Sequence, residues 1–428
     1  MRSARNAIPT RKRSDDESTG ASGRRMSLPL QGVRVLDMST SYAGPTATMY
    51  MGDMGADVIK VERPVEGDDA RAWGPPFIGE DSAWFLSANR NKRSICIDLA
   101  SADGLGTLRR LVAGADVFVT NTNPSKLAGL GIHPDDLQPV NPALIYCSIS
   151  GFGMDGPESD RPGYDLIAQA RSGLMSLTGA KGGSPQRVST PLSDVVTGLV
   201  AAFATAAALL RRERTGAGEL IDVSLLECDL ALIAPRAASF LAGDPEPVPC
   251  GATDSVLAIY QAFETADEPV ALAIGNDRIW TRCCAVLDLD HLAADVELGD
   301  NAGRRRRREE IIAAIGERLR HQPASRWVER FAAEGVPCQP VHGMSKVVGD
   351  PHLKDRGAFG EYRTTGGETF TTVRAPWRLG SADRGPAAPP PKLGAHTVMV
   401  LEEAGFDHSE INELVDRGAV WDGMTQAA

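Results

Sequence analysis

The sequence predicts an α/β protein built on a doubly wound parallel sheet, followed by a second, smaller α+β unit. Two observations support this prediction. Between residues 33 and 149, short apolar and β-branched runs alternate with helical patterns, which is the order of successive βαβ units. Beyond residue 245, two strand-like runs precede three helical patterns, which is typical of a separate mixed unit.

The first unit opens with a strand, a loop that ends in Gly44, and a helix that begins at Pro45 and continues to about Met54. The strands expected in this unit are Val33–Met38, Asp57–Val61, Ser94–Leu99, Asp116–Thr120, Leu144–Ile149 and Glu219–Leu225. Helices are expected at Asp103–Ala113 and Leu226–Leu241. Because ligands bind at the carboxyl ends of the strands in such sheets, we expect a binding site there. The loops concerned are Ser39–Gly44, Glu62–Pro64, Thr120–Pro124 and Ser150–Gly156.

The stretch from Gly163 to Gly218 places two acids where chemistry could use them. From Tyr164 the spacing of Ile167, Ala170, Leu174 and Leu177 predicts a helix with one buried apolar face. Asp194 then directly precedes Val195–Leu210, a run so apolar that we expect a helix buried on every side. In that position Asp194 is either an N-cap or a functional carboxylate kept ionised at the positive end of the helix, and spacing alone does not decide.

The rest of the chain divides at Pro245–Gly251. We expect a disordered tail over 1–27, a large domain over 28–245, a small domain over 246–350, and a segment 351–428 that returns to the large domain. The small domain has strands at Ile259–Phe263 and Val270–Ile274, and helices at Asp277–Leu287, Arg306–Arg320 and Ser325–Glu334. The last segment has a hairpin at Glu361–Arg374, a stiff linker at Ala387–Pro391, and helices at His396–Glu403 and Ser409–Arg417.

Composition excludes several classes of protein. The chain has 428 residues and a net charge of −11, which argues against binding to nucleic acid through its phosphates. Its seven cysteines are scattered without metal-ligand spacing, so we expect no metal and reduced thiols in the cytoplasm. The run Val195–Leu210 is shorter than the ~20 residues of a membrane span, so no span is expected.

Several motifs in order resemble the family III CoA-transferases, also called the CaiB/BaiF family, over about residues 28–420. They are LDMSTSYAGPTATMYMGDMGADVIKVERP (36–64), NKRSICIDL (91–99), GYDLIAQARSGLMSLTG (163–179), LSDVVTG (192–198), RTGAGELIDVSLLE (214–227) and LGAHT (393–397). An ordered set over almost the whole chain is far more specific than any one of these motifs.

The resemblance implies a Rossmann-like large domain, a smaller domain, and two subunits interlocked like chain links, in a homodimer or in a heteromer with a paired gene product. It implies that Asp194 is the catalytic nucleophile and that Asp165 assists it. Acyl-CoA would be a substrate, with no permanently bound cofactor. The residues implied to contact CoA are Ser41, Tyr42, Ala43, Arg63, Ile97, Asn121 and Thr122.

The implied reaction moves CoA from an acyl-CoA donor to a carboxylic acid acceptor. A carboxylate is ionised at neutral pH, so it can attack a thioester without a separate base, giving an aspartyl anhydride and then an aspartyl-CoA thioester. One alternative is an acyl-CoA racemase or isomerase, but such relatives carry a His where Tyr164 stands here. The other is a non-catalytic, CoA-binding partner subunit. Tyr42 and Gly129 replace a Gln and an Arg of the formyl-CoA transferases, which argues against formyl or oxalyl specificity.

Overall fold

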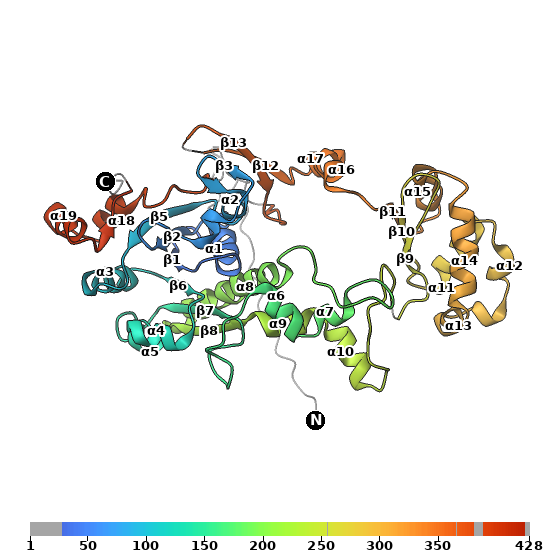
Figure 1. The fold of residues 1–428 in the computed structure, drawn as a ribbon, viewed down its shortest axis with the longest axis horizontal. Coiled ribbons are helices and arrows are strands. Elements are labelled where there is room, and N and C mark those ends of the chain that lie inside the picture. The colour runs from blue at the N-terminus through green and yellow to red at the C-terminus, as the bar shows by residue number, and fades with distance from the viewer. Residues whose placement is uncertain (1–27, 255, 365, 381–387, 424–428) are drawn as a thin grey trace, which may run out of the picture.

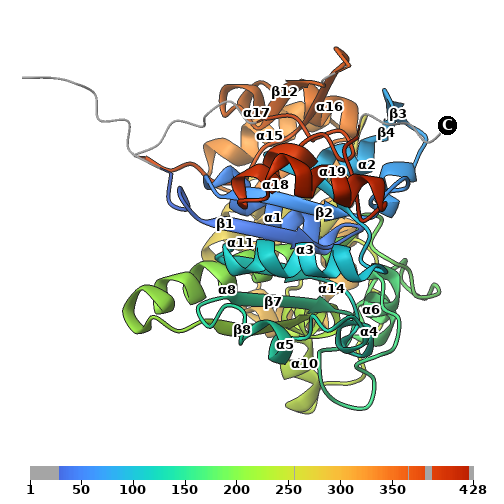
Figure 2. The same ribbon diagram turned by 90° about the vertical axis from the view of Figure 1, so that its left-hand side faces the viewer.

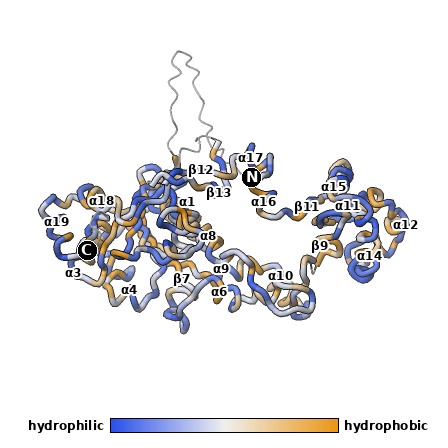
Figure 3. Tube along the Cα trace, turned by 45° about the horizontal axis from the view of Figure 1, so that its top comes forward, coloured by the Kyte–Doolittle hydropathy of each residue, from blue (hydrophilic) through white to orange (hydrophobic). Residues whose placement is uncertain are grey.

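The computed structural model describes residues 28–254, 256–364, 366–380 and 388–423 (Figure 1). The predicted tail at 1–27 and Ala387, the first residue of the predicted linker, lie outside this range. The chain forms a large lobe around one sheet and a smaller lobe at the other end of the molecule (Figure 1). The two lobes are joined by two separate stretches, one after α10 (Ala234–Leu241) and one before α16 (Met344–Gly349) (Figure 3).

The large lobe is organised around a seven-stranded sheet with the order β14-β5-β2-β1-β6-β7-β8. Its strands are β1 (Arg34–Met38), β2 (Asp57–Glu62), β5 (Lys92–Ile97), β6 (Val117–Thr120), β7 (Ile145–Ser150), β8 (Glu219–Ser224) and β14 (Val420–Trp421). All neighbours pair in parallel except β14, which runs antiparallel to β5 at one edge. The six predicted strands are therefore confirmed, whereas the short strand β14 was not predicted.

Helices cover both faces of this sheet, so the prediction of a doubly wound fold is confirmed. Alternate strand residues such as Val35 and Val117 pack with α1 (Ala43–Asp53) and α8 (Leu192–Thr215). Their neighbours Leu36 and Phe118 pack on the opposite face. The helices of that face are α3 (Ala102–Ala113), α4 (Pro124–Leu130), α5 (Pro134–Leu137), α18 (Thr397–Glu403) and α19 (His408–Asp416).

The C-terminal segment lies against the large lobe. Figure 2 looks at the end of the molecule where α18 and α19 lie beside α3, far from the smaller lobe in Figure 1. The predicted hairpin is confirmed as β12 (Phe359–Arg363) and β13 (Thr369–Val373). Tyr362 and Phe370 of this hairpin form a small core with Phe85 and Leu86. Those two residues belong to α2 (Ala83–Ala88), which follows η1 (Asp69–Ala72), β3 (Phe77–Ile78) and β4 (Asp81–Ser82).

The smaller lobe has its own core, built around Trp280 and Phe331. A three-stranded sheet, β11-β10-β9, is formed by β9 (Tyr260–Phe263), β10 (Val270–Ala273) and β11 (Cys338–Pro340). The predicted helices are found as α11 (Asp277–Val286), α14 (Arg308–Leu319) and α15 (Ala324–Ala333). The shorter elements were not predicted: α12 (Asp290–Ala293), η2 (Val296–Leu298) and α13 (Asn301–Arg306), with α16 and α17 (Pro351–Asp355) after β11.

Two predicted helices are each divided in the structure. The helix expected from Tyr164 to Leu177 is split into α6 (Asp165–Arg171) and α7 (Leu174–Leu177) at Gly173, whose φ of +91° is not helical. The helix expected at Leu226–Leu241 is split into α9 (Leu225–Leu232) and α10. Pro235 lies in the first turn of α10 and has no N–H for a hydrogen bond to α9, so one continuous helix cannot form.

The predicted burial of two helices is wrong. In α6 the apolar side chain of Ile167 is exposed, while Asp165, Ala168 and Gln169 are buried. In α8, which was expected to be buried on every side, Phe203 is 77% exposed and Leu199 and Leu210 are exposed too. Both helices thus present apolar side chains away from the core of this chain.

The length argument against a membrane span also needs correction. The helix that contains Val195–Leu210 is 24 residues long, and by length and composition α8 could cross a membrane. In the structure α8 packs on α1, β7 and β8, and Arg212 in its last turn pairs with Asp116. These are the contacts of a core helix. One face of α8 is apolar because it packs on the sheet and on α1, and the exposed stripe of Leu199, Phe203 and Leu210 makes the opposite side apolar as well.

Candidate functional site

The predicted ligand-binding residues gather at one edge of the sheet. Ser41, Tyr42 and Ala43 follow β1, Arg63 follows β2, Ile97 ends β5, and Asn121 and Thr122 follow β6. These four strands are neighbours in the order β5-β2-β1-β6. Strand order along the chain reverses between β1 and β6, and in open α/β sheets ligands bind at such a point.

At this reversal point the side chain of Asn121 clamps the loop after β6 to the loop after β1. The Thr40 backbone N–H donates to Asn121 Oδ1 over 3.0 Å, and Asn121 Nδ2 donates to the Thr40 carbonyl over 2.9 Å. Ser41, the next residue, has a φ of +71°, a left-handed conformation that is costly for a residue with a Cβ. Its N–H donates to Asp68 Oδ1 over 2.9 Å. The loop after β1 is thus held in a strained shape by side chains from two other loops.

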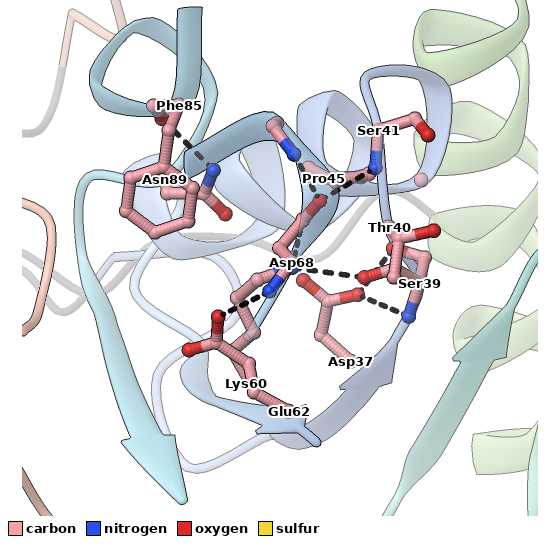
Figure 4. A network of polar contacts seen from close by, with 12 residues as sticks. Asp37, Ser39, Thr40, Ser41, Pro45, Lys60, Glu62, Asp68, Phe85 and Asn89 are labelled. Atoms are coloured by element: carbon pink, nitrogen blue, oxygen red, sulfur yellow. Dashed lines mark hydrogen bonds and ion pairs between the residues drawn. The ribbon is translucent and has the colours of Figure 1, made fainter. Parts of the chain in front are cut away.

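Two buried lysines, Lys60 and Lys92, hold the backbone of this loop and of the first turn of α1; Lys60 is shown in Figure 4. Lys60 Nζ donates to the Ser39 carbonyl and lies 2.8 Å from Asp68 Oδ2. Lys92 Nζ donates to the Pro45 carbonyl and lies 2.9 Å from Asp37 Oδ2. A buried charge is stable only when it is paired and hydrogen-bonded, and these four side chains meet that requirement together.

The charges of this network are mutually dependent. Burial alone would raise the pKa of Asp37, but Lys92 and Lys60 beside it hold that pKa well below its usual range. Burial lowers the pKa of Lys92 to about 8, with Asp37 opposing the shift. For Lys60 burial acts in the same direction, but Asp68, Asp37 and Glu62 outweigh it and raise the pKa. The loop after β1 is therefore supported by a buried network of charges, Lys60, Lys92, Asp37 and Asp68, which we call the charged platform. Apolar packing, as expected around a buried strand, does not provide this support.

Three of the predicted contact residues already have protein partners. Ile97 is buried among core residues, so its side chain is not available to a ligand. Arg63 is 54% exposed on its side chain and pairs with Asp69 and Glu66. The Tyr42 hydroxyl lies 3.0 Å from Ser87 Oγ, and its ring meets Trp84 edge-on. Arg63 and Tyr42 remain at the surface of the strand-end loops.

Asp194 lies within the first turn of α8 and not before it. The N-cap position is Pro191, which offers no side-chain cap, so the N-cap interpretation of Asp194 is wrong. One turn later Gly198 packs against α1, where a Cβ would lie 2.8 Å from the Ala43 carbonyl oxygen and 3.0 Å from Thr46. Glycine at this position therefore lets the helix that carries Asp194 approach the loop after β1.

Asp165 is held beside this turn by two donors. The Ser193 N–H donates to Asp165 Oδ1 over 2.9 Å, and Gln169 Nε2 donates to Oδ2 over 2.7 Å. Gln169 also accepts from the Val188 N–H through its Oε1, over 2.9 Å, which fixes the loop before α8. Arg187, whose side chain is 46% exposed, places its guanidinium 4.0 Å from Asp165 Oδ2. The structure thus brings Asp165 and the turn of Asp194 together.

The Asp194 carboxyl is more basic than an ordinary aspartate. Burial, then the charges of Asp165 and Asp229, raise its pKa to about 7. The expectation that the helix terminus keeps Asp194 fully ionised is therefore wrong, because desolvation and two neighbouring carboxylates outweigh the helix dipole. At neutral pH both protonation states of Asp194 are populated.

A third acid, Asp229 in α9, was not singled out in the sequence. It is fully buried, and its Oδ2 accepts from Ser193 Oγ over 2.8 Å. The signal available in the sequence was a charged residue between Cys228 and Leu230 in a helix that is otherwise mainly apolar. Among the residues that the structure describes, no group of three or more His, Cys, Asp or Glu side chains has the arrangement of a metal site.

Comparison with known families decides the classification. The model of CoA-transferase family III matches residues 30–397. The chain belongs to CoA-transferase family III. The prediction of this enzyme class, made from the ordered motifs, is confirmed.

Curated members of family III are similar over most of this chain. The human succinyl-CoA:glutarate CoA-transferase is 39% identical over 92% of this chain and 90% of its own length. The succinate–glutarate CoA-transferase of Agrobacterium fabrum is 36% identical, over 88% and 95%. Among solved structures, a CaiB/BaiF family protein from Brucella suis superposes with a TM-score of 0.78 at 36% identity, covering 89% of this chain and all of that one.

Proposed function

We propose that Asp194 is the nucleophile of this family III transferase and that Asp165 assists it. The observation that carries the proposal is the position of Asp194, in the first turn of α8 and beside Asp165, one turn before Gly198 packs on the start of α1. The free N–H groups of this turn and its positive dipole favour an anion at this position. Its raised pKa gives a carboxylate that is a better nucleophile than an ordinary one and is still ionised in part at neutral pH.

The proposed reaction proceeds through two kinds of covalent intermediate. The Asp194 carboxylate attacks the thioester carbonyl, the C–S bond breaks, and CoA leaves as a thiolate from an aspartyl anhydride. The thiolate then attacks the aspartyl carbonyl, which releases the donor acid and forms an aspartyl-CoA thioester. The acceptor carboxylate attacks this thioester to form a second anhydride and free the thiolate again. Attack by that thiolate on the acceptor carbonyl yields the new acyl-CoA and regenerates Asp194.

We propose that the large lobe is Rossmann-like and that CoA binds at the reversal point between β1 and β6. Counted along the chain, the parallel strands lie in the order 3-2-1-4-5-6, which supports this description. The residues proposed to contact CoA are Ser41, Tyr42, Arg63, Asn121 and Thr122, with the buried Ala43 and Ile97 contributing at most their backbone. The planar guanidinium of Arg63 suits a phosphate, provided that it leaves Asp69 and Glu66.

We propose that the donor and acceptor acids are dicarboxylates of the succinate and glutarate type. The similar enzymes are named for those substrates. A second carboxylate needs a cation near the reacting acids, and Arg187 lies beside Asp165 with its side chain half-exposed. The names of these relatives favour transfer over racemisation. Tyr164 at the start of α6, in place of a His, agrees with that preference.

We propose that two copies of the chain assemble as an interlocked homodimer in the cytoplasm. Leu199, Phe203 and Leu210 form an exposed apolar stripe along one face of α8, and a continuous stripe of this kind is typical of a protein–protein contact. A paired heteromer would use the same stripe. The cysteines are free thiols, in keeping with a reducing compartment.

The first experiment measures intact mass after mixing the protein with succinyl-CoA and other acyl-CoAs, followed by hydroxylamine. We expect a CoA-sized adduct that hydroxylamine removes. Asp194→Ala should abolish it, whereas Glu213→Gln, an exposed acid of the same helix, should not. No adduct with any donor, together with solvent deuterium exchange at the α-carbon that requires Asp194, would support the racemase. If neither signal is seen, the partner-subunit alternative stands.

A further inference from the structure

Asp229 is a buried carboxyl without a cation. Its Oδ2 accepts from Ser193 Oγ over 2.8 Å and lies 3.4 Å from Ser172 Oγ. Its Oδ1 is buried and has no hydrogen-bond partner among the described residues. The groups of the described residues that act on it are Ser193, Ser172 and Asp165, and none of these is a cation. An isolated buried carboxylate costs several kcal/mol, so this acid is not explained by stability.

Ser193 connects Asp229 to both proposed reacting acids. It directly precedes Asp194, its N–H donates to Asp165 Oδ1, and its hydroxyl donates to Asp229 Oδ2. One residue therefore ties α6, α8 and α9 together at the turn that carries Asp194. The anchor on α9 is firm, because Leu225 and Cys228 of that helix belong to the main core.

We propose that Asp229 is a positioning residue for Asp194: through Ser193 it fixes the first turn of α8, and its negative charge strengthens Asp194 as a nucleophile. The inference rests on the proposed role of Asp194 and adds a residue that does not itself touch the substrate. An uncharged acceptor in place of Asp229 could hold the Ser193 hydroxyl equally well, so the two effects can be separated by substitution.

The charged groups around Asp194 come from three directions. Asp165 faces it from α6 and Asp229 from α9. Burial makes the largest contribution to the raised pKa of Asp194, and the charges of these two acids add to it. Arg187, from the loop before α8, acts on Asp165 at 4.0 Å. The contact with α1 brings the Ala43 backbone and Thr46 rather than a charged side chain. Removal of the Asp229 charge should therefore lower the pKa of Asp194, since only Asp165 would remain as a negative neighbour.

The test follows the rate of CoA-adduct formation from succinyl-CoA between pH 5 and 9. In Asp229→Asn we expect the midpoint of the acid limb to move down by about one unit, the usual size of such a charge effect. Glu227→Gln is the matched control, since it removes an exposed charge two residues away on the same helix. Its midpoint should equal that of the unmodified protein. Equal midpoints in both variants would overturn the proposal while leaving Asp194 as nucleophile.

Ser193→Ala tests the positioning role directly and decides the question if Asp229→Asn does not fold. It removes the hydroxyl that links the turn of Asp194 to Asp229, so we expect a plateau rate lower by about tenfold, as for a misplaced reacting group. An unchanged plateau would overturn the positioning role. If the unmodified protein forms no adduct at any pH, the proposed function itself fails and this inference falls with it.

Discussion

The side chain of Asn121 holds the backbone of Thr40 in both directions, accepting from its N–H over 3.0 Å and donating to its carbonyl over 2.9 Å. The two residues are 81 positions apart and follow the adjacent strands β6 and β1. The amide thus fixes the loop that contains Ser41, Tyr42 and Ala43. The family resemblance implied that Asn121 contacts CoA, and its observed contact adds a different role, which is to shape the loop after β1.

The first prediction concerns this clamp. Asn121→Ala removes both hydrogen bonds and frees the strained backbone at Ser41, so the CoA loop loses its preorganised shape. We expect the KM for acyl-CoA to rise about tenfold with a smaller change in kcat, because uniform binding rather than the chemical step is affected. Steady-state kinetics test this, with the exposed amide variant Gln138→Ala as control. A change confined to kcat would contradict it.

The second prediction is a pH profile. Asp194 must be ionised to attack, and burial together with Asp165 and Asp229 raises its pKa to about 7. The pre-steady-state rate of adduct formation should therefore fall tenfold per unit on the acid side, with a midpoint near pH 7 rather than near 4. A midpoint near 4 would show that the carboxyl is better solvated than its surroundings suggest.

The third prediction concerns stability. The native pKa of Asp194 is above its unfolded value, so the favourable contribution of its protonated form is present at low pH and is lost as pH rises through 7. Asp194→Asn has no such loss. Its free energy of unfolding should match the unmodified protein near pH 4 and exceed it by roughly 4 kcal/mol at pH 8. Urea denaturation at the two pH values measures the difference, and a gain that is equal at both would argue against the titration of Asp194.

The sequence allowed the sheet to be predicted almost completely, because its strands are short apolar runs separated by helical patterns. Lys60 within β2 and Lys92 at the start of β5 gave no sign of their function. Their burial depends on Asp68 and Asp37, which reach them from a later loop and from β1. Such pairs are set by tertiary proximity, and a periodicity that separates polar from apolar residues assigns them to the surface.

The prediction of which faces of α6 and α8 are buried failed for a related reason. An apolar helical face predicts a buried helix, but in this chain Ile167 and Phe203 are exposed while Asp165 and Gln169 are buried. The two polar residues turn inward because they hydrogen-bond to each other and to the backbone N–H groups of Ser193 and Val188, and the apolar ones turn outward. Asp194 was singled out by its position before the apolar run Val195–Leu210, but only the family motif pointed to it as the nucleophile. Asp229 was missed because a single acid in an apolar helix is indistinguishable from a surface position until the partner Ser193 is known.

The fourth prediction tests the charged platform. Lys60→Met keeps the length of the side chain but leaves Asp68 and Asp37 buried without that cation. We expect a loss of about 3–5 kcal/mol in the free energy of unfolding, the usual cost of breaking a buried pair. The variant that folds should also bind acyl-CoA more weakly, because the Ser39 carbonyl loses the hydrogen bond from Lys60. The exposed Lys354→Met is the control, and equal stabilities would mean that the platform reorganises.

The last prediction concerns the exposed stripe of α8. Phe203 is 77% exposed in the isolated chain, an unfavourable position for a large aromatic side chain unless a second copy covers it. Phe203→Glu would place a charge in that contact. On the proposal of a homodimer, we expect sedimentation equilibrium to show a dimer for the unmodified protein and a monomer for this variant. Val296→Glu is the matched control, because Val296 is 92% exposed on the smaller lobe. If Phe203→Glu remains a dimer, the two copies meet through another surface, and the outward apolar face of α8 needs a different partner.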